Sequence, residues 1–390
     1  MKNKSNSNLN QIANIGSNIE NRTLPIRVLG IDLGTTNSTV TNLLKEKDSK
    51  EVIETYEIKQ EIPNSGYTID KLLPSVVAII NGETFIGEGA KRKRGENKLY
   101  KNIFYECKND IGNQKTYNNA PEGYKNPKDI ASIIIKRLHE VAQKEDDNHI
   151  SKICVTIPAS FQLSQKNDTR NAAISSGISD DKLILIDEPV AAAIGASLPV
   201  TEPIGTMIVD IGGGTTEIAV ISLNGIGVLE TINTAGDEQT EAIVQWFKDH
   251  HKLAIGERTA EMIKCTVGSA VRTSGKSIAV KGLDLITGIP KTVQISSDEI
   301  RQALSESIYQ ITAAIKRALD KTPPEHASDL IDFGIVMTGG GAQLKGLDEH
   351  IKNKTGLPVH VAEDPIYSVV KGTGIVLDSL KKYQNVLIQP

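Results

Sequence analysis

Aromatic side chains make up only 4% of this 390-residue sequence, and cysteines number three. The core must therefore be built mainly from aliphatic side chains. Cys107, Cys154 and Cys265 lie far apart and form no Cys-x-x-Cys pair, which argues against a zinc site or a disulfide framework. We expect three buried or half-buried free thiols in a reducing compartment.

A surplus of positive charge and long apolar runs are also missing. The formal net charge is −4, from 44 Lys and Arg against 48 Asp and Glu, so nothing points to a nucleic-acid partner. No apolar run reaches the roughly 18 residues that a membrane-spanning helix needs. The remaining composition is that of an ordinary globular protein, and the length predicts two or three domains.

The first 25 residues are rich in Asn and Ser and have few large apolar side chains, a composition typical of disorder. They contain no continuous apolar core, so we do not expect a signal peptide. Leu9, Ile12, Ile15 and Ile19 recur at helical spacing, which leaves a short amphipathic helix as the alternative. We predict a disordered tail over 1–25 that offers a contact for a protein partner or a membrane.

From Ile26 onward, apolar segments of strand length alternate with segments of helical periodicity. Strand–turn–strand patterns are predicted at 26–44 and 207–223, single strands at 76–80 and 152–158, a strand leading into a helix at 182–198, a strand, turn and helix at 334–351, and helices at 127–144, 167–178, 237–250, 258–270 and 298–319. This alternation predicts an α/β protein.

One pattern occurs twice in the chain. An apolar strand ends in an aspartate, a turn rich in Gly and Thr follows, and a second apolar strand comes next. The two aspartates, Asp32 and Asp210, are 178 residues apart, which is close to half the chain. The repeat predicts two similar halves, each presenting one turn to a shared cleft.

The residue types of these turns suit a polyphosphate. Glycines let the backbone approach closely, and successive N–H groups in a tight turn form an anion-binding concavity. Carboxylates would repel phosphate, but they fit a hydrated Mg²⁺ held between them and the phosphates. A third turn, Thr338–Gly341, lies between a strand and a helix, and its backbone could approach the α-phosphate or the adenosine of a nucleotide. No Walker A sequence and no GxGxxG at a helix start occur, which excludes the P-loop and dinucleotide-binding folds.

A single glycine turn of this kind is usually an ordinary hairpin. Two in register, together with the third turn and the acid Glu188, favour a nucleotide site. These motifs resemble the actin, heat-shock-chaperone and sugar-kinase ATPase superfamily over about residues 26–382. The first part is similar to DnaK-type chaperones, in GIDLGTTNSTV, LPSVVAI, FIGEGAKRK and ICVTIPASF. From about Ile186 the chain resembles MreB-type bacterial actins, in EPVAAAIGASLPV, GTMIVDIGGGTTEIAVISLNG and GIVMTGGGAQLKGLDEHI.

The resemblance implies an α/β actin-like ATPase fold of two lobes, each with a duplicated ribonuclease-H-like mixed-sheet core and an outer subdomain. Lobe I would span 26–185, with its outer subdomain inserted at about 45–125. Lobe II would span 186–382, with an insertion at about 237–300. Residues 383–390 would form a C-terminal tail, which is a second possible contact for a protein partner.

The resemblance also implies roles for single residues. Asp32 and Asp210 would hold Mg²⁺ through water, and Glu188 would position or activate the attacking water. Lys108 lies four residues before Gly112, as a catalytic lysine does in the chaperones, although an exposed lysine on a charged loop is the alternative. The phosphates would be held by Gly34, Thr35, Thr36, Asn37, Gly212, Gly213, Gly214, Thr215 and Thr216, and the adenosine by Glu261, Lys264, Gly339, Gly340 and Gly341.

The function implied is that of a slow ATPase, with ATP or ADP and Mg²⁺ as cofactors, that polymerises with itself into cytoskeletal filaments as its lobes close on nucleotide. We expect a cytoplasmic protein, with membrane association as an open alternative. The competing hypothesis is a non-polymerising, DnaK-type ATPase switch that lacks a peptide-binding domain. A sugar kinase is a third and weaker hypothesis, because no sugar-binding signature is seen. ATP-driven sedimentation separates the first two hypotheses.

Overall fold

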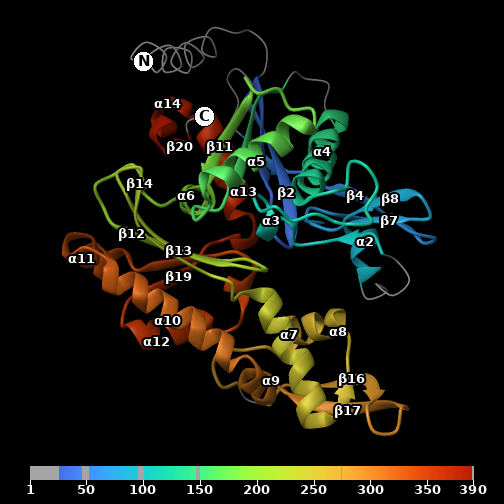
Figure 1. Cartoon of the computed structure of the whole chain (residues 1–390). Coiled ribbons are helices and arrows are strands. Elements are labelled where there is room, and N and C mark those ends of the chain that lie inside the picture. The colour runs from blue at the N-terminus through green and yellow to red at the C-terminus, as the bar shows by residue number, and fades with distance from the viewer. Residues whose placement is uncertain (1–25, 46–51, 95–100, 146–149, 274, 389–390) are drawn as a thin grey trace. The chain divides into compact units, whose positions relative to one another are not determined.

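The computed structural model describes residues 26–45, 52–94, 101–145, 150–273 and 275–388. The predicted N-terminal tail lies outside the described residues. The chain divides into two compact units (Figure 1). Unit 1 runs to Ser197 and also takes in the chain from Val369 onward, and unit 2 is Leu198–Ser368.

Unit 1 is built on one mixed sheet with the strand order β20-β11-β10-β1-β2-β3, in which β6 also pairs with β2. The neighbours of β1 are antiparallel β2 and parallel β10, and β11 continues the parallel part. The strands are β1 (Ile26–Asp32), β2 (Asn37–Lys45), β3 (Val52–Thr55), β6 (Leu73–Pro74), β10 (Ile150–Ile157), β11 (Leu183–Asp187) and β20 (Leu387–Ile388).

Helices pack tightly on this sheet. They are α4 (Pro127–Glu145), α5 (Leu163–Ser175), α6 (Glu188–Gly195), α13 (Ser368–Asp378) and α14 (Leu380–Tyr383), which the short turn η5 (Gln384–Val386) follows. On α13, a Cβ added at Gly372 would lie 1.8 Å from the Ala191 carbonyl oxygen. On β1, a Cβ added at Gly30 would lie 1.8 Å from Thr373 Oγ1. Only glycine permits this close packing of α13 in unit 1.

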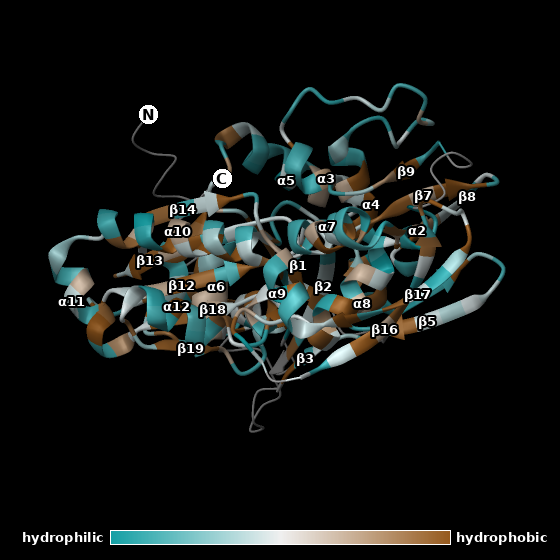
Figure 2. Ribbon diagram, turned by 90° about the horizontal axis from the view of Figure 1, so that it is seen from below, coloured by the Kyte–Doolittle hydropathy of each residue, from teal (hydrophilic) through white to brown (hydrophobic). Residues whose placement is uncertain are grey.

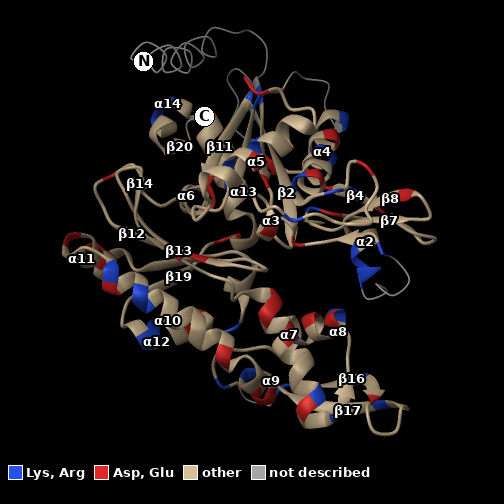
Figure 3. Cartoon of the chain, viewed as in Figure 1, with Lys and Arg blue, Asp and Glu red and all other residues tan. Residues whose placement is uncertain are grey.

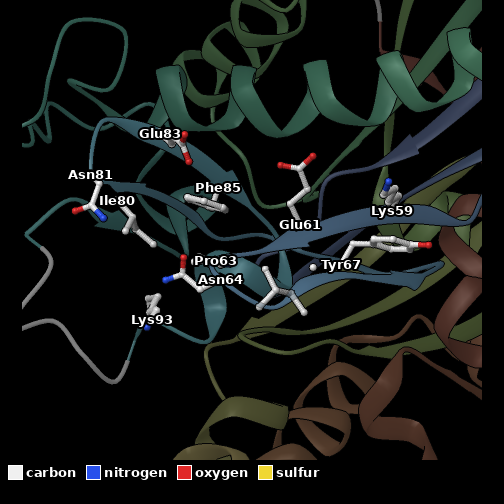
Figure 4. A pocket seen from close by; sticks show the side chains of 12 residues that line it. Lys59, Glu61, Pro63, Asn64, Tyr67, Ile80, Asn81, Glu83, Phe85 and Lys93 are labelled. Carbon is white, nitrogen blue, oxygen red and sulfur yellow. The ribbon is translucent and has the colours of Figure 1, made fainter.

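The outer part of unit 1 holds two small sheets, β4–β5 and β8–β7–β9. Its elements are β4 (Ile58–Ile62), β5 (Gly66–Asp70), β7 (Val77–Ile80), β8 (Glu83–Ile86), α2 (Glu88–Lys91), β9 (Ile103–Phe104) and α3 (Cys107–Asp110). A hollow of about 360 Å³ opens between them and is lined by Glu61, Tyr67, Phe85 and Lys93, among others (Figure 4). None of the residues that line it is among those predicted to hold the nucleotide.

Unit 2 repeats the core of unit 1. Its sheet has the order β14-β13-β12-β18-β19, and β12 is again flanked by an antiparallel β13 and a parallel β18. The strands are β12 (Thr206–Ile211), β13 (Thr216–Ser222), β14 (Gly225–Ile232), β18 (Ile335–Thr338) and β19 (Val359–Val361). The order matches β3-β2-β1-β10-β11 strand for strand, which confirms the predicted duplicated mixed-sheet core.

The helices of unit 2 follow the same α/β alternation. They are α7 (Gly236–Trp246), α8 (Glu257–Val267), α9 (Ser297–Ala303), α10 (Ser305–Lys321), α11 (Pro324–Phe333) and α12 (Leu347–Thr355), with short turns η3 (Gly340–Gln343) and η4 (Pro365–Tyr367). A π-helix, η2 (Phe247–His251), continues α7. The outer sheet has the order β15-β16-β17, formed by β15 (Leu253–Ala254), β16 (Ser277–Asp284) and β17 (Pro290–Ser296).

The core of each unit is aliphatic, as the composition predicted. Fully buried side chains include Leu29 and Ile31 on β1 and Val209 and Ile211 on β12. The central strands of both sheets are accordingly coloured as hydrophobic (Figure 2). The parallel strand β11 and the second half of β10 are mostly buried and carry nearly continuous apolar runs, as expected for strands covered on both faces, whereas the edge strand β19 is largely exposed.

Several local expectations differ from the structure. The helix predicted over 298–319 is two helices, because the chain breaks at Leu304 and the Ser305 hydroxyl donates to the Gln302 carbonyl. The segment predicted as a C-terminal tail supplies β20, which pairs with β11. Unit 1 extends to Ser197 rather than ending at 185, since β11 is a strand of its sheet and α6 follows β11 directly.

The cysteines follow the expectation in part. Cys107 and Cys154 are buried and free, whereas Cys265 is free but exposed on α8. Burial raises the pKa of the Cys107 thiol to about 12. In the part of the chain that the structure describes, no helix is both long and apolar enough to cross a membrane.

Candidate functional site

The first glycine turn joins β1 to β2 in unit 1. Asp32 is the last residue of β1, and Asn37 is the first of β2. A Cβ added at Gly34 would lie 2.0 Å from the Asn37 carbonyl oxygen, so the turn closes only around glycine. The Gly34 carbonyl accepts a hydrogen bond from Ser75 Oγ at 2.7 Å, which fixes the turn to the next segment.

Asp32 lies in a half-buried position at the end of β1. Its Oδ1 accepts a hydrogen bond from Thr156 Oγ1 on the neighbouring strand β10 at 2.8 Å. Burial raises the pKa of Asp32 above its ordinary value, although the Lys108 cation and the Thr156 hydroxyl oppose the rise. A second positive charge placed beside this carboxylate would stabilise its ionised form.

Lys108 and Glu188 form a buried ion pair. Lys108 lies on α3 and is 5% exposed, and Glu188 is the first residue of α6 and is 8% exposed. The alternative of an exposed lysine on a charged loop is therefore wrong. The two residues are 80 positions apart, and their pairing brings the predicted lysine to the predicted water-positioning acid. Next to Glu188, Asp187 pairs with Lys166 at 3.5 Å.

The second glycine turn joins β12 to β13 in unit 2. It closes on itself, because the Gly212 N–H donates to the Thr215 carbonyl at 2.9 Å. The start of α7 is attached to it, since the N–H groups of Gly236 and Asp237 donate to the carbonyls of Gly212 (3.2 Å) and Gly213 (2.8 Å). The turn thus lies at the N-terminus of an 11-residue helix, where an anion is favoured.

Thr216 is the first residue of β13 and is fully buried. Its hydroxyl donates to the Thr234 carbonyl at 2.7 Å. The Thr216 hydroxyl is therefore engaged within the unit-2 core. Among the predicted phosphate-binding threonines, Thr35 is partly exposed, and its Oγ1 lies 3.5 Å from Asn109 Oδ1.

Glu261 and Lys264 lie on α8 and meet the start of α7. Lys264 Nζ donates to the Gly236 carbonyl at 2.7 Å and to Thr240 Oγ1 at 2.9 Å. It also pairs with Glu261 Oε2 at 2.7 Å, and Glu261 accepts from Thr240 Oγ1 at 2.6 Å. Burial acts to raise the pKa of Glu261, but Lys264 and the hydroxyl outweigh it, so that pKa is lowered. The ionised form of Glu261 is thus favoured beside the second turn.

The third turn lies directly against Asp210. Gly339 has a φ of +81°, and a Cβ added there would lie 2.5 Å from Asp210 Oδ1 and 2.3 Å from the Ile211 carbonyl oxygen. A Cβ at Gly341 would lie 2.3 Å from Ile211 Cγ2. The residues predicted to hold adenosine and the second aspartate are thus neighbours in unit 2.

Two residues beside Asp210 were not among the predicted site residues, although Thr338 had been placed in the third turn. Glu217 lies opposite Asp210 on β13 and is 3% exposed, and Thr338 lies opposite it on β18. Thr338 Oγ1 is buried and has no hydrogen-bond partner among the described residues. The sequence did contain a signal for the position of Glu217. Each of the two predicted metal-holding aspartates is followed seven positions later by a polar residue that lies opposite it on the next strand, Thr39 for Asp32 and Glu217 for Asp210.

The residues around Asp210 fit a hard cation. Within the described ranges, no group of three or more His, Cys, Asp or Glu side chains is arranged to hold a metal ion directly. The oxygen donors present, which are carboxylates and the hydroxyl of Thr338, are those that Mg²⁺ takes in proteins while keeping several waters. We name the group Asp32, Gly34, Lys108 and Glu188 the unit-1 half-site. The unit-2 half-site is Asp210, Glu217, Gly212–Gly214, Glu261, Lys264 and Gly339–Gly341.

Two sheets of identical strand order, each with an aspartate beside a glycine turn on its central strand, define the actin-like ATPase class. Comparison with known proteins agrees. The family model described as MreB/Mbl protein matches residues 122–385, and that described as Hsp70 protein matches 28–126. The chain therefore belongs to the MreB/Mbl family. Its N-terminal part carries the Hsp70 likeness that the sequence predicted, although the MreB/Mbl match begins at 122 rather than near 186.

Comparison with individual relatives supports the same family assignment. The chain is 43% identical over 230 residues to the cell shape-determining protein MreB of Escherichia coli (strain K12), covering 59% of this chain and 66% of that protein. It is 40% identical over 232 residues to the cell shape-determining protein Mbl of Bacillus subtilis (strain 168), covering 59% and 69%. The chain thus spans about two thirds of the length of these relatives.

Solved structures extend the likeness to nearly the whole chain. The crystal structure of MreB 5 of Spiroplasma citri bound to AMPPNP matches with a TM-score of 0.72 at 26% identity, over 92% of this chain and 97% of that one. The structure of the same protein bound to ADP matches with the same score and identity. The predicted actin-like ATPase fold is confirmed.

Proposed function

We propose that this chain binds ATP with Mg²⁺, hydrolyses it slowly to ADP and phosphate, and polymerises in its ATP-bound form into cytoskeletal filaments that act in cell shape. The observation that carries the proposal is the duplicated half-site: two matched sheets each place an aspartate beside a glycine turn. The relatives support it, since two are named as cell shape-determining proteins and a third was solved with AMPPNP and with ADP.

Each half-site would contribute a different part of the nucleotide site. The backbone N–H groups of the two glycine turns would hold the β- and γ-phosphates, helped by the N-terminus of α7. Asp32 and Asp210 would hold Mg²⁺ through water, and Glu217 and Thr338 would complete the polar surroundings of Asp210. When bound, Mg²⁺ would neutralise phosphate charge. Gly339–Gly341, Glu261 and Lys264 would surround the adenosine.

The buried pair of Lys108 and Glu188 would act directly in ATP hydrolysis. Glu188 would accept a hydrogen bond or a proton from the attacking water, and Lys108 would keep its carboxylate in place. The same cation would offset negative charge on the γ-phosphate, so that Lys108 serves both the acid and the phosphate. Catalysis would then be positioning and charge stabilisation, as in other phosphoryl transfers.

Phosphate release by the full chain with Mg²⁺-ATP tests this assignment. Asp210→Ala should abolish turnover and leave the fold intact, because the residue lies at a strand end. Glu188→Ala should slow hydrolysis by about 10²-fold, as for loss of a general base, and keep nucleotide binding. Glu349→Ala, which removes an exposed acid on α12, is the matched control and should behave as the wild type. Unchanged turnover of Asp210→Ala would refute the site.

A non-polymerising chaperone-like ATPase is the second candidate. The Hsp70 match over 28–126 favours it, and so does the burial of Lys108 within that segment. This candidate shares the nucleotide site and the ATPase activity with the first. It differs in one outcome, because ATP would then change the shape of a monomer without producing sedimentable polymer.

A further inference from the structure

Helix α3 brings a further side chain to the first glycine turn of unit 1. Thr35 lies in that turn, and its hydroxyl donates a hydrogen bond to Asn109 Oδ1 on α3 at 3.5 Å. The two residues are 74 positions apart in the sequence. A separation of 3.5 Å is long for a hydrogen bond between two oxygens, so a closer partner would readily replace this contact.

The segment that carries Asn109 is firmly anchored in unit 1. Cys107 is 2% exposed and belongs to the core of the unit. Gly112, two residues beyond the end of α3, has a φ of +80°, and a Cβ added there would lie 2.7 Å from Gln165 Cα on α5. Only glycine permits this close packing. Asn109 itself is exposed, so a fixed segment presents a side chain that can exchange partners.

The charges around Asn109 are already paired (Figure 3, with basic residues blue and acidic residues red). Each charged residue of the segment 106–115 has an opposite charge beside it: Glu106 pairs with Arg94 at 3.0 Å, Lys108 with Glu188, and Asp110 with Lys115. Asn109 is the polar side chain of α3 that stands outside these pairs. Its amide carries two N–H donors besides the acceptor oxygen, so it can donate to an anion without adding negative charge.

The position of Asn109 next to Lys108 indicates which phosphate it would meet. Lys108 pairs with Glu188, the acid proposed to position the attacking water. In ATP hydrolysis this water attacks the γ-phosphoryl group, so α3 would lie at the γ end of the nucleotide. Asn109 also contacts the glycine turn proposed to hold the β- and γ-phosphates. Both neighbours therefore point to the γ-phosphate.

We propose that Asn109 recognises the γ-phosphate and makes the unit-1 half-site prefer ATP to ADP. This inference rests on the proposed nucleotide binding and adds a residue that distinguishes the two nucleotides. With ATP bound, the Thr35 hydroxyl and the Asn109 amide would both donate to γ-phosphate oxygens, in charge-assisted hydrogen bonds that replace their contact with each other. With ADP bound, the contact between Thr35 and Asn109 would persist.

Isothermal titration of the full chain with Mg²⁺-AMPPNP and with Mg²⁺-ADP tests this role. Asn109→Ala should weaken AMPPNP binding by about tenfold or more, as expected for loss of a hydrogen bond to a charged group, and change ADP binding by less than about twofold. Asn109→Leu keeps the size of the side chain and removes its donors, so it should behave as Asn109→Ala does. Asn113→Ala, at an exposed residue four positions later, is the matched control and should bind both nucleotides as the wild type does.

The ratio of the two affinities separates recognition of the γ-phosphate from a structural role, and retained ADP binding verifies that the variants fold. An equal loss for AMPPNP and ADP in Asn109→Ala would show that the residue only supports the turn. Unchanged AMPPNP binding in both Asn109 variants would likewise refute the inference, while binding by the wild type would leave the proposed function intact. A wild-type protein that binds neither nucleotide would overturn the proposed function and this inference together.

Discussion

At the scale of single residues, the structure adds most to the prediction for Lys108. The sequence left it between a catalytic lysine and an exposed loop residue. Its burial beside Glu188 settles its position, because a buried cation needs a partner. Sequence spacing could not show this, since the two residues come from segments 80 positions apart.

The Lys108–Glu188 pair leads to a prediction about both stability and turnover. Lys108→Met should destabilise the protein by about 3–5 kcal/mol, because it strands a buried carboxylate. Adding Glu188→Gln should restore much of that stability and leave ATP turnover low. Thermal unfolding and phosphate release measured on the same samples separate the two effects. Equal turnover in the single variant and the wild type would show that the pair is only structural.

At the scale of elements, the strands and glycine turns follow from the sequence. The strand–turn–strand patterns at 26–44 and 207–223 and the helix at 127–144 appear where periodicity placed them, because each carries its signal locally. Features that depend on distant contacts were missed, such as the pairing of β20 with β11 and the position of Glu217 beside Asp210. The π-helix at 247–251 has helical periodicity and so looked like a continuation of α7.

The third glycine turn gives a test with a matched control. Gly339→Ala places a Cβ against Asp210 at a φ of +81°, whereas Gly356→Ala meets no atom within 4 Å at a φ of +76°. Gly356→Ala should cost about 1–2 kcal/mol for its left-handed backbone, and Gly339→Ala should cost more, because a φ of 81° with a ψ of 168° is a conformation essentially restricted to glycine. Only Gly339→Ala should also displace Asp210 and weaken ATP binding by about tenfold or more, since a 1.4 kcal/mol loss is tenfold. Isothermal titration with Mg²⁺-ATP checks this, and equal affinities of the two variants would contradict it.

At the scale of the whole molecule, the chain combines two likenesses within one superfamily. The segment 28–126 matches the Hsp70 model, and 122–385 matches the MreB/Mbl model. The two units nevertheless share one strand order, and the sheet of unit 1 takes strands from both matched segments, so the fold tolerates different outer parts on the same core. The repeated aspartates predicted two similar halves from the sequence alone, and the mixed-sheet core of each half followed from the family resemblance.

ATP-driven assembly into filaments is the main proposal for this chain. High-speed pelleting of the full chain with ATP, with ADP and without nucleotide, followed by negative-stain imaging of each sample, tests it most directly. We predict filaments in the ATP sample and far less pelleted protein in the other two. A monomer that hydrolyses ATP yet stays in the supernatant under all three conditions would contradict the claim and favour the chaperone-like switch.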